Sequence, residues 1–293
     1  MATLPNPLPK LASDPSGRSL GLQLPPGVLL DTTYDGPADE PLLWHAGRDV
    51  SPGNWAALGA PAARVGLLPL LVDVGSTQGG LEHWHLRPGQ TSYPGDHEAE
   101  EVLASYWDEY AAYEAGAGDD HPGRDKVVEL FGEPATYEEQ VAPFGPDWPG
   151  LAPAGVLAAD PDVRAAGVAD ALSDGRGDWF KQPRLALVPA RRSADIPAAI
   201  GWSGPVNYES DVARLCAVLR SWEDRFGIRV VALGFDILVV SVAAPPTTLA
   251  EAEAVAAEHF AFCPDNVVQG EAETLRAYAE ELVGERVWSF WWD

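Results

Sequence analysis

The sequence predicts an α+β fold: a C-terminal split βαβ-like sheet, a ferredoxin-like variant with helices on one face, preceded by an N-terminal α/β region. Three observations lead to this class. Apolar runs of strand length recur along the chain, and several segments carry apolar residues at helical spacing. The last third also reads in the order strand, helix, strand, strand, helix, helix, strand.

The N-terminal part is expected to begin with a flexible leader over residues 1–17, followed by an α/β domain over residues 18–145. Short apolar runs predict strands in this domain, and the longer run "ARVGLLPLLVDV" predicts a buried one. The strands are expected within residues 20–24, 27–32, 41–46 and 63–74.

A helix is predicted after Pro94-Gly95, with Asp96 as its N-cap, because apolar and aromatic residues recur at helical spacing up to Tyr113. Residues 115–125, "AGAGDDHPGRD", indicate a loop. Residues 146–180 are rich in Pro, Gly and Ala and indicate a connector, within which Asp160-Pro161 begins a short helix.

Residues 181–293 are predicted to form the C-terminal α+β domain. Gly227 stands where a helix would end in a left-handed residue, and Thr248 with Glu251 has the spacing of a capping box. Gly234-Phe235-Asp236 joins two apolar runs as a hairpin. The expected strands are 183–190, 228–233, 237–243 and 286–292, and the expected helices are 209–226, 248–263 and 271–284.

The chain ends in "RVWSFWWD", and both faces of the predicted last strand are largely apolar. One face carries Trp288, Phe290 and Trp292, and the other carries Trp291. This pattern favours an interior strand with Trp291 packed against a helix. An exposed hydrophobic segment held out for a partner is the alternative.

The charge balance bears on partners. Asp plus Glu number 44 against 19 Lys plus Arg, a formal net charge of -25. This disfavours nucleic acid and anionic membranes, and it favours a basic protein partner. Acidity that serves only solubility is the alternative. Two cysteines are too few for a disulfide scaffold, and no apolar run is long enough to span a membrane. We therefore expect a cytoplasmic protein, with its oligomeric state open.

Two histidine-containing stretches can be considered for chemistry. His259 and Cys263 lie four residues apart on one predicted helix, where they would serve as ligands or nucleophile, or simply as core residues. His83 and His85, with carboxylates nearby, have the spacing of one strand face, and a metal-dependent hydrolase is imaginable. Neither stretch fixes a third ligand, so no metal, cofactor or catalytic residue is predicted.

Loop residues supply the candidate binding site. "GWSGPVN" lacks the G-x-S-x-G pattern of a nucleophile elbow, and we find no phosphate-binding or dinucleotide motif. Polar and aromatic groups in and beside the predicted loops would instead line a groove. The candidates are Trp202, Asn207, Tyr208, Asp236, His259, Asp265 and Asn266.

The motifs "GWSGPVN", "RFGIRVVALGFD", "AEHFAFCPDN" and "VWSFWWD" together resemble a mostly actinobacterial family of uncharacterised proteins with a C-terminal domain of unknown function. The resemblance covers the last part of the chain well and the first half loosely. It implies an intracellular bacterial protein, and it brings no activity and no catalytic residue.

These observations predict a non-enzymatic protein-interaction module, of the immunity or antitoxin-like kind, that captures a basic partner. The alternative is a small-molecule-binding protein or enzyme with its site at the seam between the two domains.

Overall fold

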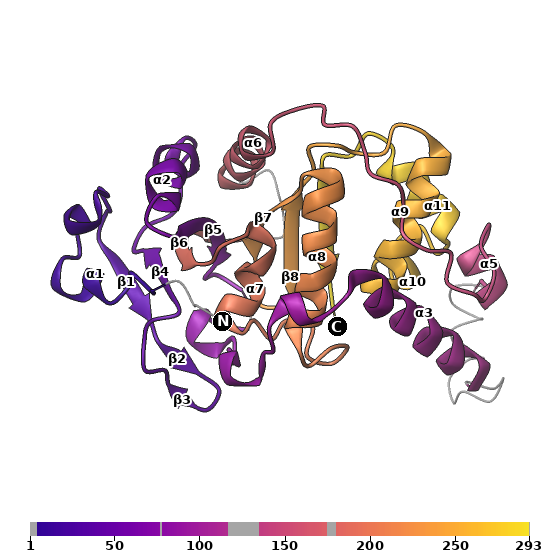
Figure 1. Cartoon of the computed structure of the whole chain (residues 1–293), viewed down its shortest axis with the longest axis horizontal. Coiled ribbons are helices and arrows are strands. Elements are labelled where there is room, and N and C mark those ends of the chain that lie inside the picture. The colour runs from indigo at the N-terminus through magenta and orange to yellow at the C-terminus, as the bar shows by residue number, and fades with distance from the viewer. Residues whose placement is uncertain (1–4, 77, 117–134, 175–179, 293) are drawn as a thin grey trace.

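The centre of the molecule is a seven-stranded mixed sheet (Figure 1). The computed structural model describes residues 5–76, 78–116, 135–174 and 180–292. Neighbouring strands run antiparallel, except that β5 and β7 are parallel. Across the sheet the order is β1 (Gly27–Leu30), β4 (Leu43–Ala46), β6 (Pro183–Pro189), β5 (Leu67–Asp73), β7 (Arg229–Leu233), β8 (Ile237–Ser241) and β9 (Val287–Trp291). A separate ribbon pairs β2 (Thr32–Thr33) with β3 (Gly36–Pro37).

The predicted α+β class is confirmed by this mixed sheet and its helices. The strand order shows one feature that the sequence pattern did not contain. β5, from the first half of the chain, lies between β6 and β7, so these two strands run antiparallel to each other rather than parallel as in a βαβ unit. Strands from 18–145 and from 181–293 thus pair within one sheet. The division into two domains stays a prediction.

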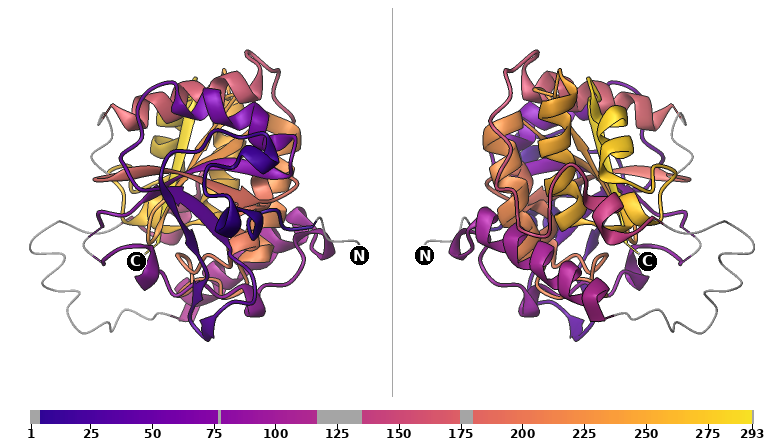
Figure 2. Two further views of the ribbon diagram at one scale, coloured as in Figure 1. Left: turned by 90° about the vertical axis from the view of Figure 1, so that its left-hand side faces the viewer. Right: turned by 90° about the vertical axis from the view of Figure 1, so that its right-hand side faces the viewer.

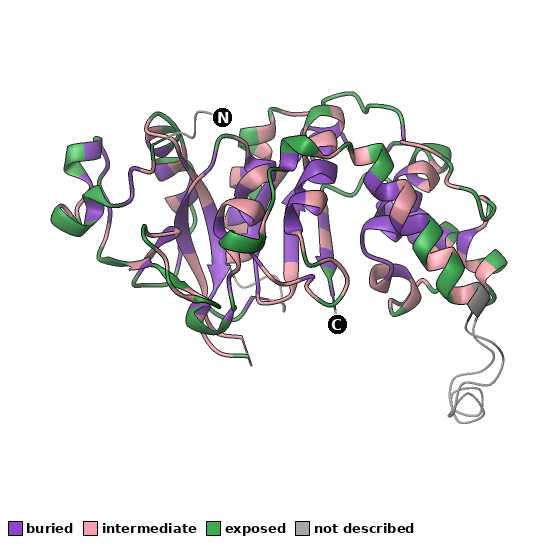
Figure 3. Cartoon of the chain, turned by 60° about the horizontal axis from the view of Figure 1, so that its bottom comes forward, coloured by how far each residue is buried: buried purple, intermediate pink, exposed green. Residues whose placement is uncertain are grey.

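Helices from both parts of the chain cover one face of the sheet (Figure 2). Their inner sides are buried and their outer sides exposed (Figure 3). α8 begins after the N-cap Asp211 and ends at Gly227 in the left-handed region, and α9 has the predicted capping box of Thr248 and Glu251. The helices are α3 (Ala99–Gly116), α5 (Tyr137–Val141), α7 (Ile196–Ile200), α8 (Val212–Phe226), α9 (Leu249–Phe262), α10 (Asp265–Val268) and α11 (Leu275–Leu282).

The opposite face is covered by α2 (Asn54–Ala63) and α6 (Pro161–Ser173), which contact each other (Figure 1). α6 has the predicted start, with the Asp160 side chain accepting hydrogen bonds from the first turn. α1 (Lys10–Ser13) adds Leu11 to the same apolar cluster, and Leu8 is fully buried. From residue 5 onward, the leader expected to be flexible is therefore packed against the protein.

Two further expectations differ from the structure. Residues 20–24 form no strand; a 3-10 turn ends at Leu20, and Leu22 and Leu24 then pack into the core. α3 begins at Ala99 rather than just after Asp96, which belongs to a separate 3-10 turn. The predicted loop at 115–125 lies, from residue 117 on, outside the described residues.

The 3-10 turns are η1 (Arg18–Leu20), η2 (Leu81–His83), η3 (Pro88–Gln90), η4 (Pro94–Asp96) and η5 (Ser193–Asp195).

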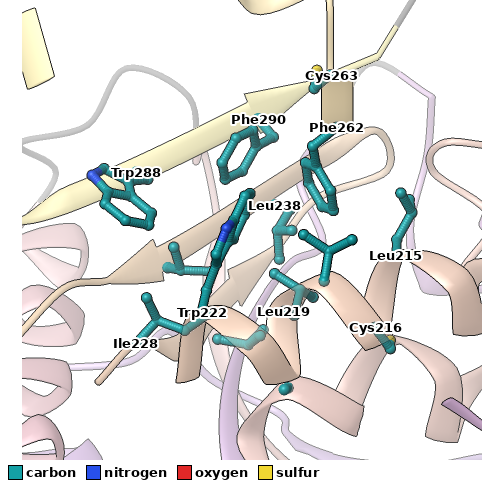
Figure 4. Close-up of a cluster of buried hydrophobic side chains, with 14 of the residues drawn as sticks. Leu215, Cys216, Leu219, Trp222, Ile228, Leu238, Phe262, Cys263, Trp288 and Phe290 are labelled. Atoms are coloured by element: carbon teal, nitrogen blue, oxygen red, sulfur yellow. The ribbon is translucent and has the colours of Figure 1, made fainter. Parts of the chain in front are cut away.

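The last strand, β9, buries one face only. Phe290 stacks on Trp222 of α8, with ring centroids 5.4 Å apart, and Trp288 meets the same indole edge-on at 5.6 Å (Figure 4). Trp291, on the other face, is 36% exposed. The prediction that it packs on a helix is wrong: β9 is the edge strand, and on this face Val287 packs against the cluster beneath α2 and α6, whereas Trp291 at the other end of the strand stays exposed.

A buried ion pair joins α8, α9 and the connector. Glu258 is fully buried in α9, and Arg225 of α8 binds it in bidentate fashion, Nη1 to Oε1 at 2.7 Å and Nη2 to Oε2 at 2.6 Å. The same carboxylate accepts hydrogen bonds from the backbone N–H of Ala152 at 2.6 Å and from the indole of Trp222 at 2.7 Å. Four donors thus satisfy one buried charge, which is the condition for tolerating it.

Truncating the two tryptophans on opposite faces of β9 should have different effects. Trp288→Ala should lower the free energy of unfolding by about 3–5 kcal/mol, because it leaves a cavity beside Trp222. Trp291→Ala should cost less than about 1 kcal/mol, since its side chain is on the surface. Urea unfolding of both variants measures the difference, and equal losses would contradict the assignment of the two faces.

Glu258→Gln should destabilise the protein by roughly 3–5 kcal/mol, because Arg225 then loses its buried partner charge. Glu253→Gln, on the same helix, is the matched control: its partner Arg276 is 60% exposed at 3.8 Å, so the loss should stay near zero. Thermal unfolding of both variants compares them. A Glu258 variant as stable as the Glu253 variant would show that the buried ion pair does not contribute to the stability of the fold.

Candidate functional site

The structure divides the predicted site residues into two groups. Trp202 is buried, donates its indole N–H to the backbone oxygen of Gly234 at 3.0 Å and contacts the ring of Trp292. The Tyr208 hydroxyl donates to the backbone oxygen of Ala261. The backbone oxygen of Asp236 accepts from the N–H of Trp292, and Asn207 is exposed on its loop. Tyr208 thus reaches the end of α9, close to the second group, and the assembly of all seven candidates into one site stays a prediction.

The second group, His259, Asp265 and Asn266, gathers where α9 gives way to α10, beside β9. At its centre is Tyr278 of α11, whose hydroxyl lies 3.0 Å from His259 Nδ1 and accepts from Asn266 Nδ2 at 3.3 Å. Sequence reasoning missed Tyr278. The available signal was its place on the inner face of a predicted helix, because a buried tyrosine hydroxyl needs a hydrogen-bond partner.

Asn266 takes the place of a neighbouring strand at the edge of the sheet. Its Nδ2 donates to the backbone oxygen of Ser289 at 2.6 Å, and its Oδ1 accepts from the backbone N–H of Trp291 at 3.3 Å. Cys263 Sγ donates to the backbone oxygen of Trp291 at 3.0 Å. Unpaired edge groups are a template for unwanted strand pairing, and these side chains occupy several of them.

Burial keeps the side chains of His259, Cys263 and Tyr278 uncharged at neutral pH. It lowers the pKa of His259 from 6.5 to about 3. It also raises the pKa of the Cys263 thiol and of the Tyr278 hydroxyl. A neutral imidazole, a protonated thiol and a protonated phenol form hydrogen bonds without supplying a thiolate or a charged acid. The hydrogen bonds of His259, Cys263, Asn266 and Tyr278 link α9, α11 and β9. We call these four residues the brace.

A pocket of about 620 Å³ opens outside this brace. Its walls include Trp288, Trp291, Tyr278 and Leu282, and four acidic residues lie among the lining groups. Glu271, Glu281 and Glu285 are exposed, whereas Asp265 is half-buried. The acidic lining residues are Asp265, Glu271, Glu281 and Glu285. We call this the β9 pocket; it combines an aromatic wall with a negative rim.

One polar atom of the pocket wall stands out. The indole N–H of Trp288 has no hydrogen-bond acceptor within the described part of the chain, although the residue is only 1% exposed. Buried donors are normally paired. A backbone carbonyl of a bound peptide would satisfy this donor, whereas a lysine or arginine head, which carries donors only, would not.

The histidine pair considered for a metal lies elsewhere. His83 and His85 are both exposed. Across residues 5–76, 78–116, 135–174 and 180–292, no group of three or more His, Cys, Asp and Glu side chains could hold a metal ion. None of the helices in the same ranges is long and apolar enough to cross a membrane.

Fold and site together define an α+β protein with an acidic, aromatic-walled pocket at the edge of its sheet. Residues 184–293 match the family model described as "Domain of unknown function (DUF4253)". The match supports a C-terminal domain of unknown function, and both the brace and the β9 pocket lie inside it. No curated protein and no solved structure matches the chain.

The depressed pKa of His259 predicts a loss of stability in mild acid. The unfolded chain binds a proton at His259 below about pH 6.5, whereas the folded protein does so only near pH 3. The free energy of unfolding therefore falls as the pH drops through this window. Between pH 7 and 5, it should fall by about 1–2 kcal/mol more for the native protein than for His259→Phe. Urea titrations at both pH values test this, and parallel losses would disprove it.

Proposed function

We propose that this chain is a non-enzymatic interaction module that captures a basic partner, in the manner of an immunity or antitoxin-like protein, and that the β9 pocket receives a lysine or arginine side chain. The observation that carries the proposal is the combination of Trp291 with four carboxylates around one pocket. A cation can lie over the exposed indole while the carboxylates pair with its charge.

The charge of the whole chain supports the same partner. A formal net charge of -25 creates a field that attracts and orients a basic protein before contact. Such steering is unspecific, so specificity needs a local feature. In the β9 pocket, the aromatic wall supplies it, because a lysine or arginine stem packs on apolar surface while its head meets the acidic rim.

A basic peptide provides the direct test. The probe is a fluorescein-labelled decapeptide of alternating glycine and arginine, and its affinity is measured by fluorescence anisotropy at several salt concentrations. Glu281→Gln combined with Glu285→Gln should weaken binding at least about fivefold, because the pocket loses two partner charges. Trp291→Ala should weaken it by a similar factor through the lost cation–π contact.

The matched control removes the same charge elsewhere. Glu100 and Glu101 are exposed on α3, away from the pocket. Glu100→Gln with Glu101→Gln therefore removes the same two negative charges while leaving the β9 pocket intact. The proposal requires this control to bind almost like the native protein. If both double variants lose affinity to the same extent, net charge alone explains the binding and the pocket has no part in it.

A further inference from the structure

The outer edge of β9 has backbone groups that no neighbouring strand meets. Successive residues of a strand direct their N–H and C=O groups alternately to its two sides. Just past the end of β9, the N–H of Trp292 donates to the backbone oxygen of Asp236, on the β8 side. The backbone groups of Trp288 and Phe290 therefore also face β8, and those of residues 287, 289 and 291 face outward.

Side chains bind most of these outward groups. The brace binds the N–H and the oxygen of Trp291 and the oxygen of Ser289. At the other end of the strand, Glu285 Oε1 accepts from the N–H of Val287 at 3.0 Å. Within the described part of the chain, the backbone oxygen of Val287 and the backbone N–H of Ser289 have no hydrogen-bond partner. We call these two groups the open edge of β9.

The open edge lies at the β9 pocket. Val287 and Ser289 both line this pocket and are half-buried. The indole N–H of Trp288, also on the wall, has no acceptor among the described residues, and its nitrogen edge points away from Trp222 and Phe290 in Figure 4. The pocket thus has one acceptor and two donors to satisfy. A lysine or arginine head supplies donors only, whereas a peptide main chain supplies both donors and acceptors.

We propose that the β9 pocket binds an extended peptide segment, whose main chain adds to the open edge of β9. The inference rests on the proposed basic partner and specifies how that partner presents its lysine or arginine. One residue of the segment donates its N–H to the oxygen of Val287 and accepts from the N–H of Ser289. In strand addition of this kind, main-chain hydrogen bonds give affinity and side-chain pockets give specificity.

The two open groups also set the direction of the segment. In a parallel pair, one residue bonds to two residues of the neighbouring strand, whereas an antiparallel hydrogen-bonded pair exchanges both bonds with a single residue. The open groups belong to Val287 and Ser289, on either side of Trp288. The segment therefore runs parallel to β9, with one residue opposite Trp288.

The main-chain contact is only one residue long, because Glu285 and the brace bind the backbone groups on either side. So short a contact needs further interactions to hold a partner. The exposed carboxylates of Glu271, Glu281 and Glu285 are at the same pocket, where they can pair with a basic side chain of the segment.

Two probes of equal length and charge test the main-chain contact by fluorescence anisotropy. The first is the labelled glycine–arginine decapeptide. The second is a labelled peptoid that alternates sarcosine with N-(3-guanidinopropyl)glycine, which keeps the carbonyls and the guanidinium groups but has no N–H in its main chain. The peptoid should bind the native protein roughly tenfold more weakly, because the hydrogen bond to Val287 is lost. This ratio should be the same at every salt concentration, since the charges are equal.

A proline at position 289 tests the protein side of the same contact. Ser289→Pro removes the open N–H, and an edge strand accepts proline where the N–H faces outward without a partner. The variant should bind the decapeptide roughly tenfold more weakly than the native protein, and no better than it binds the peptoid. Ser289→Ala keeps the N–H and is the matched control, which should bind both probes as the native protein does.

A measurement on the native protein covers the case in which Ser289→Pro does not fold. The backbone N–H of Ser289 should exchange with deuterium more slowly when the decapeptide is bound, and NMR spectroscopy follows this signal directly. The melting temperatures of both Ser289 variants show whether the fold is kept.

The outcomes separate this inference from the basic-partner proposal. A decapeptide that does not bind the native protein would contradict both. Equal affinity for decapeptide and peptoid would overturn the main-chain contact and leave capture of a basic side chain standing. So would a peptoid that is weaker by the same factor on Ser289→Pro, because the flexibility of the probe would then explain the difference. Unchanged exchange of the Ser289 N–H would also overturn the contact.

Discussion

The arrangement of the C-terminal half depends on the buried pair between Arg225 and Glu258. A carboxylate within α9 is tolerated because four donors meet it, and those donors come from two separate segments, α8 and the stretch around Ala152. One of them is the indole of Trp222, which is also the ring on which Phe290 stacks. The ion pair therefore fixes the position of the aromatic core that holds the last strand.

This constraint extends to the edge of the sheet. β9 has a partner strand on one side only, and several of its outward backbone groups are met by the side chains of Asn266 and Cys263. Both lie just beyond the end of α9, five and eight residues after Glu258. The buried charge of Glu258 thus fixes the register of α9, and α9 in turn positions the side chains that bind outer backbone groups of β9. The β9 pocket lies outside these side chains.

Local signals explain how far the sequence could predict this fold. Capping residues such as Asp160 and Thr248, and the left-handed Gly227, mark helix ends through contacts within a few residues, and the structure has them as predicted. The insertion of β5 between β6 and β7 could not be predicted, because strand order is decided by packing between distant segments. The prediction for Trp291 was wrong for the same reason: its neighbours in sequence are apolar, but whether a helix covers that end of the edge strand is decided by packing between distant segments.

Even less of the candidate site could be predicted from the sequence, because its contacts join distant segments. Asn266 was expected to line a groove, and its hydrogen bonds run to a strand 23 and 25 residues away. Glu258 looked like one more charge on a helix rich in glutamate, although it is the most constrained side chain of that helix. The charged side chains of this protein are therefore of two kinds. Buried charges such as Glu258 are paired and set the register of the helices, whereas exposed ones such as Glu281 face solvent at a pocket rim. Carboxylates of the second kind are accessible at the surface, and they are the groups around which a partner can bind.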